Sequence, residues 1–378
     1  MKTFPSELLI AIFEQFLPPL VTAYDTAAAN DMPLEDQAEL FKNLVFYKLV
    51  CRRWREVIEE HPSLFSRDAH YVTEASRDGL TAKGKYAKRL VVGDVNKVGY
   101  TSDRDLAVFP NVAYVSWTCG VSQGDYFRGC GVAYPPLNHL RRLDWAFSGS
   151  FGASVDSFIR LVQHCPVLEY ITLTVAEPPL RGNDRRQIKF DVPDSVTTLG
   201  LFFRRSVLQL GLWIVSKWFT GPAASLKHFV TSGSFAPPLA FSTVELRPDP
   251  YCATQPSKSA LQHFLRNRLP QDGSNGTLIY SGATYAPPAS NDLVATERLK
   301  WVHKIVLKTS GSRHRTEDEK WDAVQQHLDF ILKQFRNLKS IDLCGDFRGW
   351  REDEVKGKVL EVFEKSAREF GVTVKYIK

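Results

Sequence analysis

The side chains with the clearest potential for chemistry are two cysteines with polar neighbours. Cys51 precedes Arg52 and Arg53, and nearby cations lower the pKa of a thiol and make it a better nucleophile. His164 and Cys165 are adjacent and could form part of a metal site. Such a site needs several ligands close together, whereas the six cysteines are widely separated in the sequence. We therefore expect Cys51 and Cys165 to be packed in the fold, with no metal site and no cofactor.

Acidic groups are the other candidates, since paired carboxyl groups can exchange protons when a pocket brings them together. Asp103 and Asp105 form one such pair, and residues 317–319 form an acidic run. Their settings are typical of turns and helix caps. The chain also lacks the phosphate-binding, dinucleotide-binding, serine-elbow and zinc-helix motifs. We predict that the protein is not an enzyme, and the alternative is an enzyme with an unusual pocket lined by groups of strongly perturbed pKa.

Composition indicates a globular protein with a small and a large module. The 378 residues are 44% hydrophobic, and the net charge of +6 comes from short basic clusters scattered along the chain. No long basic run or aromatic-basic motif accompanies them, so no nucleic-acid partner is expected. No run of about 18 apolar residues and no signal peptide occur, so no membrane is expected. Dispersed cysteines fit the reducing cytoplasm or nucleus.

Two apolar helical blocks are predicted in the first seventy residues. In residues 1–17 the large apolar side chains recur at spacings of one, three and four, and Pro5 suits the first helical turn. A loop is expected over residues 18–32, and the second block runs from Leu40 to about His61. Such short helices cannot bury all of these side chains among themselves, so part of the surface should face a partner or the next domain. An ordinary N-terminal helical cap is the alternative.

Three sequence blocks stand out here: FPSELL from Phe4, LVCRRW from Leu49 and PSLF from Pro62. Together they resemble the F-box, whose pattern begins Leu-Pro-x-Glu-Leu/Ile-Leu, continues Leu-Val-Cys-Lys/Arg-x-Trp and closes with Leu-Trp. Phe4 and Phe65 replace the leading leucine and the closing tryptophan. The segment between the first two blocks is about 15 to 20 residues longer than in the family, and such loop lengthening costs little free energy.

The resemblance implies that residues 1–70 form a small all-α module that binds the Skp-type adaptor of an SCF ubiquitin ligase, and through it a cullin scaffold. Trp54 is also expected to anchor the module's core, because a large ring fills a small core efficiently. Ubiquitin transfer would belong to another subunit, because no RING-type cysteine array is present. The adaptor-binding residues that the resemblance implies are Phe4, Pro5, Leu8, Leu9, Ile12, Val50 and Trp54.

A spaced apolar motif recurs over residues 71–378. It reads Leu-x-x-Leu-x-Leu, with other apolar residues allowed at the key positions. Four copies begin at residues 112, 140, 168 and 196, a constant step of 28 residues, which is typical of leucine-rich repeats. Weaker copies begin at residues 87, 226, 302 and 338.

Helical spacing is found between these predicted strands. It covers residues 158–165, 261–269, 321–335 and 355–370, the third preceded by a capping-box signature at Thr316 and Glu319. Gly371 should end the last helix before a strand over residues 372–376. Residues 273–290 are interpreted as a loop-rich excursion or an extra hairpin. The predicted fold is therefore α/β, an all-α F-box-like module followed by an irregular leucine-rich-repeat-like solenoid with a mostly parallel sheet.

Side chains alternate across a strand, so the residues between the key apolar positions should share the sheet's concave face. Solenoids bind large partners on such a face, although it could equally be a solvated surface. We predict a substrate-recruiting subunit that holds an unknown protein target there; the alternative is a repeat scaffold with no ligase connection. The predicted target-binding residues are Tyr114, Arg142, Asp144, Tyr170, Thr172, His228, Lys304 and Asp342.

Overall fold

The computed structural model divides the chain into two compact units. The first comprises Met1–Ile171 and Glu177–Arg186, and the second comprises Thr172–Ala176 and Gln187–Lys378. The residues that the structure describes are 5–15, 49–60, 68–71, 87–92, 109–118, 136–147, 158–159, 161–175, 192–203, 225–232, 241–247, 260–267, 275–288, 297–309 and 316–377.

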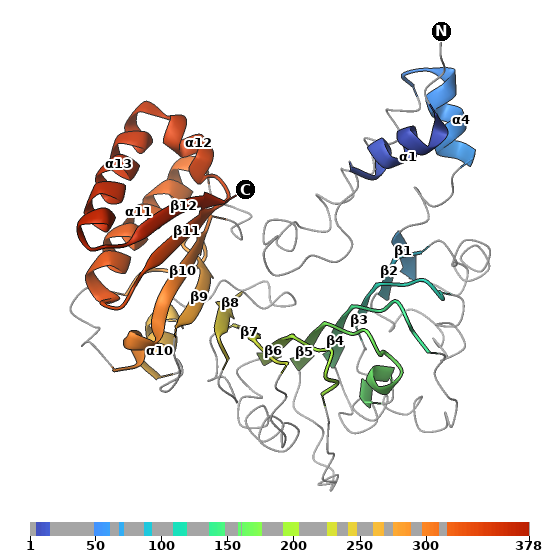
Figure 1. Ribbon diagram of the computed structural model, residues 1–378, viewed down its shortest axis with the longest axis horizontal. Coiled ribbons are helices and arrows are strands. Elements are labelled where there is room, and N and C mark those ends of the chain that lie inside the picture. Colours follow the sequence, from blue (N-terminus) through green and yellow to red (C-terminus); the bar gives the residue numbers. More distant parts are fainter. Residues whose placement is uncertain are drawn as a thin grey trace, which may run out of the picture. The chain divides into compact units, whose positions relative to one another are not determined.

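In the first unit, two amphipathic helices pack against each other: α1 (Ser6–Gln15) and α4 (Arg52–Glu60) (Figure 1). The apolar spacing found in the sequence gives α1 one buried side, with Leu9 and Phe13 packed against Val57 and Ile58. The Trp54 ring meets Phe13 edge to face, with 5.3 Å between ring centroids. The predicted loop over residues 18–32 and the start of the second helical block lie outside the described residues.

The strands of the first unit are β1 (Asp68–Tyr71), β2 (Arg89–Val92), β3 (Tyr114–Thr118) and β4 (Arg142–Phe147), each parallel to the next. The register pairs Tyr114 with Arg142, so the 28-residue step of the motif is the offset between neighbouring strands. The predicted domain boundary after residue 70 falls within β1. Tyr170 begins β5 (Tyr170–Val175), the strand within which the two units divide.

The second unit contains a parallel sheet in sequence order, formed by β6 (Thr198–Phe203), β7 (His228–Thr231), β8 (Thr243–Leu246), β9 (Gly276–Ser281), β10 (Val302–Lys308), β11 (Ser340–Cys344) and β12 (Thr373–Ile377). The predicted hairpin in residues 273–290 is wrong, since residues 276–281 form β9, which is parallel to both neighbours, whereas turns and loop follow over residues 282–288. In β9, Leu278, Ile279 and Tyr280 are all buried, which explains why this segment joins the sheet.

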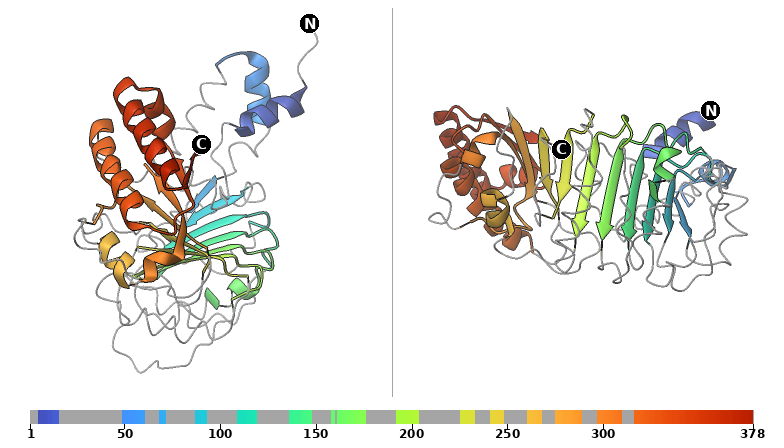
Figure 2. Two further views of the ribbon diagram at one scale, coloured as in Figure 1. Left: turned by 60° about the vertical axis from the view of Figure 1, so that its left-hand side comes forward. Right: turned by 90° about the horizontal axis from the view of Figure 1, so that it is seen from below.

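Helices cover one face of this sheet. They include α10 (Ala260–Asn267), the short helix η5 (Glu297–Trp301), α11 (Glu317–Gln334), α12 (Phe347–Glu352) and α13 (Glu354–Glu369). Figures 1 and 2 show α11, α12 and α13 together on one side of β10, β11 and β12. The capping box at Thr316 is confirmed, as is the glycine stop, where Gly371 has a φ of 73°. Among these described helices, none is both long and apolar enough to cross a membrane.

A buried histidine joins α11 to the sheet. The His327 Nε2 lies 2.6 Å from the Tyr285 carbonyl oxygen, which can only accept, so Nε2 carries the proton. The neutral ring then accepts at Nδ1 from the Tyr280 hydroxyl, at 3.3 Å. Burial lowers the pKa of His327 to about 4, despite the bond to Tyr285. The imidazole is therefore neutral in the folded protein over most of the pH range in which a free histidine becomes charged.

Stability should consequently fall with acidification. Below pH 6.5, the usual pKa of the imidazole, the unfolded chain takes up a proton that the folded chain resists down to a pH of about 4. The loss over this window should approach about 3 kcal/mol for this one group. His228 also has a lowered pKa, because of its burial, and adds to the loss in the same direction.

The two histidines are separated by measuring urea unfolding across this window for the wild type and for His327→Gln, which retains His228. The unfolding free energy of the variant should fall less than that of the wild type as the pH is lowered through this window, whatever the stability of the variant at neutral pH. Parallel curves for the two proteins would refute the assignment to His327.

Candidate functional site on the polar face of the strands

The strand face away from the helices carries the polar residues of each unit, and we call it the polar face. In the first unit, Trp145 of β4 packs edge to face on the helical residue Phe158, at 5.8 Å between ring centroids. In the second, Tyr280 of β9 packs on His327 of α11, at 5.3 Å. These rings mark the helix-covered face of each unit. Asp144 is next to Trp145 in β4, and because side chains alternate along a strand it points to the other face.

In the first unit, an arginine on the polar face is held between two tyrosine rings. The Cζ atom of Arg142 lies 4.9 Å from the centroid of Tyr114 and 4.4 Å from that of Tyr170. Asp144 lies on the same strand, with an oxygen 2.9 Å from an Arg142 terminal nitrogen. The Tyr114 hydroxyl donates to the same carboxylate at 2.6 Å. We call these four residues the Arg142 cluster.

The Arg142 cluster fixes its own side chains before any partner arrives. Strands β3 and β4 bring Tyr114 and Arg142 opposite each other, and Asp144 follows two residues later on the same face. Stacking and charge-assisted hydrogen bonds both restrict the guanidinium plane. A partner that binds here would therefore meet an ordered surface and lose little side-chain entropy in ordering it.

In the second unit, a glutamate lies at the centre of a buried charged group on the polar face. One Glu245 oxygen accepts from Lys308 Nζ at 2.8 Å and from an Arg247 terminal nitrogen at 2.8 Å. The other oxygen lies 3.2 Å from His228 Nε2. Three strands supply these side chains, since His228 begins β7, Glu245 lies in β8 and Lys308 ends β10. We call this group the Glu245 cluster.

Charge interactions in the Glu245 cluster keep the carboxylate ionised. Burial by itself would raise the pKa of Glu245, but the charges of Arg247 and Lys308, with help from His228, hold that pKa well below its usual range. Burial has the opposite effect on the base and lowers the pKa of His228, although Glu245 works against this shift. The cluster therefore combines an ionised carboxylate with a neutral imidazole at neutral pH.

Two further predicted residues form a pair in the second unit. Lys304 Nζ lies 2.5 Å from an Asp342 carboxylate oxygen, with the lysine half-buried and the aspartate buried. Thr172 is also buried, and its side chain lies against Gly200, where an added Cβ atom would be 3.1 Å from the threonine hydroxyl. Close approach of β5 and β6 thus encloses Thr172.

The predicted target-binding residues therefore lie on the polar face but differ in accessibility. Tyr114, Arg142 and Lys304 are half-buried. The other five, Asp144, Tyr170, Thr172, His228 and Asp342, are buried. Neighbouring strands in a parallel sheet are close enough for side chains on one face to cover each other. These buried residues support the half-buried ones and expose little surface of their own.

Sequence reasoning missed the centre of the Glu245 cluster. Its signal was present, because Phe241-x-x-Val244-x-Leu246 matches the repeat motif and places Glu245 at an outward position. Lys308 was missed because it follows the last key residue of its own motif copy. Its partner is 63 residues away in the sequence, a distance at which no local pattern pairs two charges.

The N-terminal helices expose some of the predicted adaptor-binding residues and bury others. Leu8 and Ile12 are 51% and 39% exposed, and Val50, just before α4, is 58% exposed. Pro5 is exposed as well, whereas Trp54 is half-buried. Leu9 is buried in the packing of α1 against α4, and Phe4 lies outside the described residues.

The cysteines and acidic runs have structural settings. Cys165 is buried, as predicted, and burial raises the pKa of its thiol to about 12. Cys51 is exposed, contrary to expectation, because it lies in the turn before α4, ahead of the residues that pack. In residues 317–319, Glu319 completes the capping box, whereas Asp103 and Asp105 lie outside the described residues. The described residues contain no group of three His, Cys, Asp or Glu side chains able to hold a metal ion.

Comparison with known proteins gives a distant structural likeness. No protein-family model matches the sequence, and no curated protein matches it significantly. Among solved structures, the leucine-rich repeat-containing protein LegL7 from Legionella pneumophila is similar over 79% of this chain and 98% of its own. The two chains are 13% identical, and the TM-score is 0.43.

Proposed function

We propose that this protein is a noncatalytic recruiting subunit. On this proposal the α1–α4 pair binds the Skp-type adaptor of an SCF ubiquitin ligase, and the polar face binds a protein target. The observation that carries the proposal is the exposed apolar side of α1, where Leu8 and Ile12 point away from the helix pair's own core. The motif blocks around Phe4 and Leu49 supply the identity of the expected partner.

The exposed side of α1 is continuous because Leu8 and Ile12 are four residues apart and therefore share one side of the helix. Leu9 and Phe13 have the same spacing on the neighbouring side and fill the core with α4. Transferring a leucine or isoleucine from water to a protein interior stabilises by about 1.5 to 3 kcal/mol. A partner that covers both residues therefore gains a favourable contribution that the isolated chain leaves unused.

Residue roles follow from this geometry. Pro5, Leu8, Ile12 and Val50 would contact the adaptor directly. Leu9 and Trp54 would contribute indirectly, by packing α1 against α4. The contact role of Phe4 rests on the motif alone.

On the polar face of each unit the target would meet the predicted residues that are half-buried, Tyr114 and Arg142 in the first unit and Lys304 in the second. Tyrosine and arginine carry much of the binding energy in many protein interfaces, and the Arg142 cluster presents both already ordered. The chain would then act by proximity, raising the effective concentration of the target at the ubiquitin donor without bond chemistry of its own.

The test is binding of the full chain to a purified Skp-type adaptor. Replacing Leu8 and Ile12 together by aspartate should weaken this complex on the order of a hundredfold, because burial of two carboxylates costs at least about 3 kcal/mol. Titration calorimetry and co-purification measure the loss. Val167→Asp is the matched control, since Val167 and Ile12 are each 39% exposed and Val167 lies outside the proposed surface.

Each result decides between the two candidate functions. Binding by the wild type and the control but not by the double variant supports the proposal. Equal binding by all three proteins would place the contact elsewhere and contradict it. If the folded wild-type chain does not bind the adaptor, the repeat scaffold without a ligase connection becomes the better description.

A further inference from the structure

The terminal helix α13 has more apolar residues than its packing uses. Leu360 and Phe363 pack into the second unit. Val355, Val362 and Phe370 instead remain 71%, 66% and 69% exposed. Single exposed apolar residues are common on protein surfaces, whereas three on one helix indicate a binding surface.

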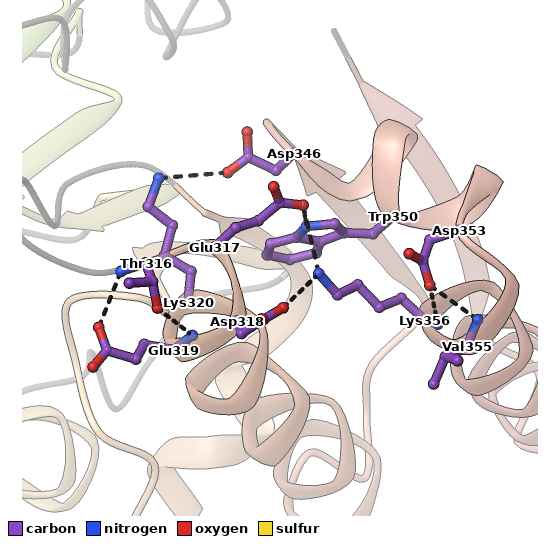
Figure 3. A network of polar contacts seen from close by, with 10 residues as sticks. All are labelled: Thr316, Glu317, Asp318, Glu319, Lys320, Asp346, Trp350, Asp353, Val355 and Lys356. Atoms are coloured by element: carbon purple, nitrogen blue, oxygen red, sulfur yellow. Dashed lines mark hydrogen bonds and ion pairs between the residues drawn. The ribbon is translucent and has the colours of Figure 1, made fainter.

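These three residues form a stripe along one side of α13. Val355 and Val362 are seven residues apart, about two turns of helix, and Phe370 follows eight residues later, slightly more than two turns, at the C-terminal cap. The stripe lies beside α11, because Lys356, the residue after Val355, reaches the start of that helix. Figure 3 shows Lys356 Nζ between Glu317 and Asp318, at 3.5 and 3.2 Å. We call Val355, Val362 and Phe370 the α13 stripe.

The neighbouring helix α11 presents an acidic surface. Five of the exposed residues of α11 are acidic, and one, Lys333, is basic. Part of the acidic set is used within the fold, since Glu317 accepts from the Trp350 indole and Glu319 belongs to the capping box (Figure 3). The acidic residues are Glu317, Asp318, Glu319, Asp322 and Asp329.

The charges of α13 disfavour a second copy of this chain as the occupant. Glu354, Lys358, Glu361, Lys365 and Glu369 are exposed and alternate in sign. A second copy would therefore bring no excess of basic residues to the acidic side of α11, so its charges do not complement this surface.

We propose that the α13 stripe and the acidic side of α11 bind an amphipathic helix of a partner protein. That helix carries apolar residues every seven positions, which cover Val362 and Phe370, and basic residues on the flank that faces α11. Opposite charges across the contact set its orientation and speed its association. This surface belongs to the second unit alone and does not depend on the ligase proposal.

The experiment uses the full chain and two synthetic helical peptides of about 18 residues, long enough for five turns. Both have leucine at heptad spacing; one has lysine on its flanks and the other has glutamate. Fluorescence anisotropy should show binding of the lysine peptide and at least about tenfold weaker binding of the glutamate peptide. The lysine peptide should bind less tightly as salt increases, because salt screens the contacts with α11.

Protein variants locate the contact. Val362→Ser combined with Phe370→Ser should weaken binding of the lysine peptide by at least about tenfold, and Asp322→Lys with Asp329→Lys should weaken it similarly and reduce its salt dependence. All these positions are exposed, so circular dichroism should show folded variants. Val167→Ser is the matched control for loss of an exposed valine, and it should bind as the wild type does.

Three results would overturn the inference. The first is equal binding of the lysine and glutamate peptides, and the second is unchanged lysine-peptide binding by both folded double variants. The third is a dimer of the wild-type chain in sedimentation that the Val362→Ser, Phe370→Ser variant abolishes, because a second copy would then occupy the stripe.

Discussion

Replacing Glu245 by glutamine should lower the free energy of unfolding by about 3 kcal/mol or more. The side chain keeps its size, but the buried negative charge that Lys308 and Arg247 both contact is removed. Attraction between these groups compensates for the cost of burying the lysine, and a neutral amide compensates far less. Because three strands contribute to the cluster, the loss should appear as cooperative destabilisation of the second unit.

Urea unfolding at neutral pH measures this effect. Glu361→Gln is the control, since it makes the same chemical change at an exposed site on α13 and should shift stability by less than about 0.5 kcal/mol. The folded pKa of Glu245 is well below the unfolded value of 4.5. Its contribution should therefore be complete above pH 4.5 and fall below that pH, so the wild type and Glu245→Gln should converge in acid. Equal unfolding curves at neutral pH would show that the cluster contributes nothing to stability.

Replacing Gly276 by alanine should destabilise the second unit by at least about 3 kcal/mol, at the upper end for overpacking a core. A Cβ atom at this first residue of β9 would lie 2.0 Å from Cε2 and 2.2 Å from Cδ2 of the Trp301 indole. The indole is buried at the end of η5, just before β10, and has little room to move. Either the ring or the β9–β10 pairing must shift.

A double-mutant cycle tests this cause directly. In the background of Trp301→Leu, which removes the clashing ring, Gly276→Ala should cost at least about 1.5 kcal/mol less than it does in the wild type. Gly349→Ala is the control, because nothing lies within 4 Å of an added Cβ atom there. Alanine also favours helix, so this control should be neutral or stabilising by up to about 1 kcal/mol. Additive effects of the Gly276 and Trp301 changes would contradict the packing argument.

Local patterns in the sequence predicted much of the secondary structure. The motif copies at residues 112 and 140 became β3 and β4, whose register has the 28-residue offset. The capping box at Thr316 and the stop at Gly371 are local in the same way, because each depends on backbone groups within one helical turn. Such features could be recognised without knowledge of distant contacts.

Strands β8 and β9 were harder to recognise because the regular repeat step ends before them. The motif copy that begins at Phe241 follows the one at Leu226 by only 15 residues. This step is too short to include the helix that was expected between two strands. Gly276 and Asn275 resembled a loop, and Asn275 does adopt a positive φ of 60°. The strand that follows is stabilised by pairing with β8 and β10, which no local pattern encodes.

By itself, the sequence determined which residues form repeating strands and helices, and which side chains point to the polar face. Both follow from periodicity, since a strand alternates every two residues and a helix turns every 3.6. Tertiary structure alone decided how far each residue is buried, which charges meet around Glu245, and that α13 leaves Val362 and Phe370 uncovered. Those outcomes depend on how closely segments far apart in the chain approach one another, and distance in space is not a property of local spacing.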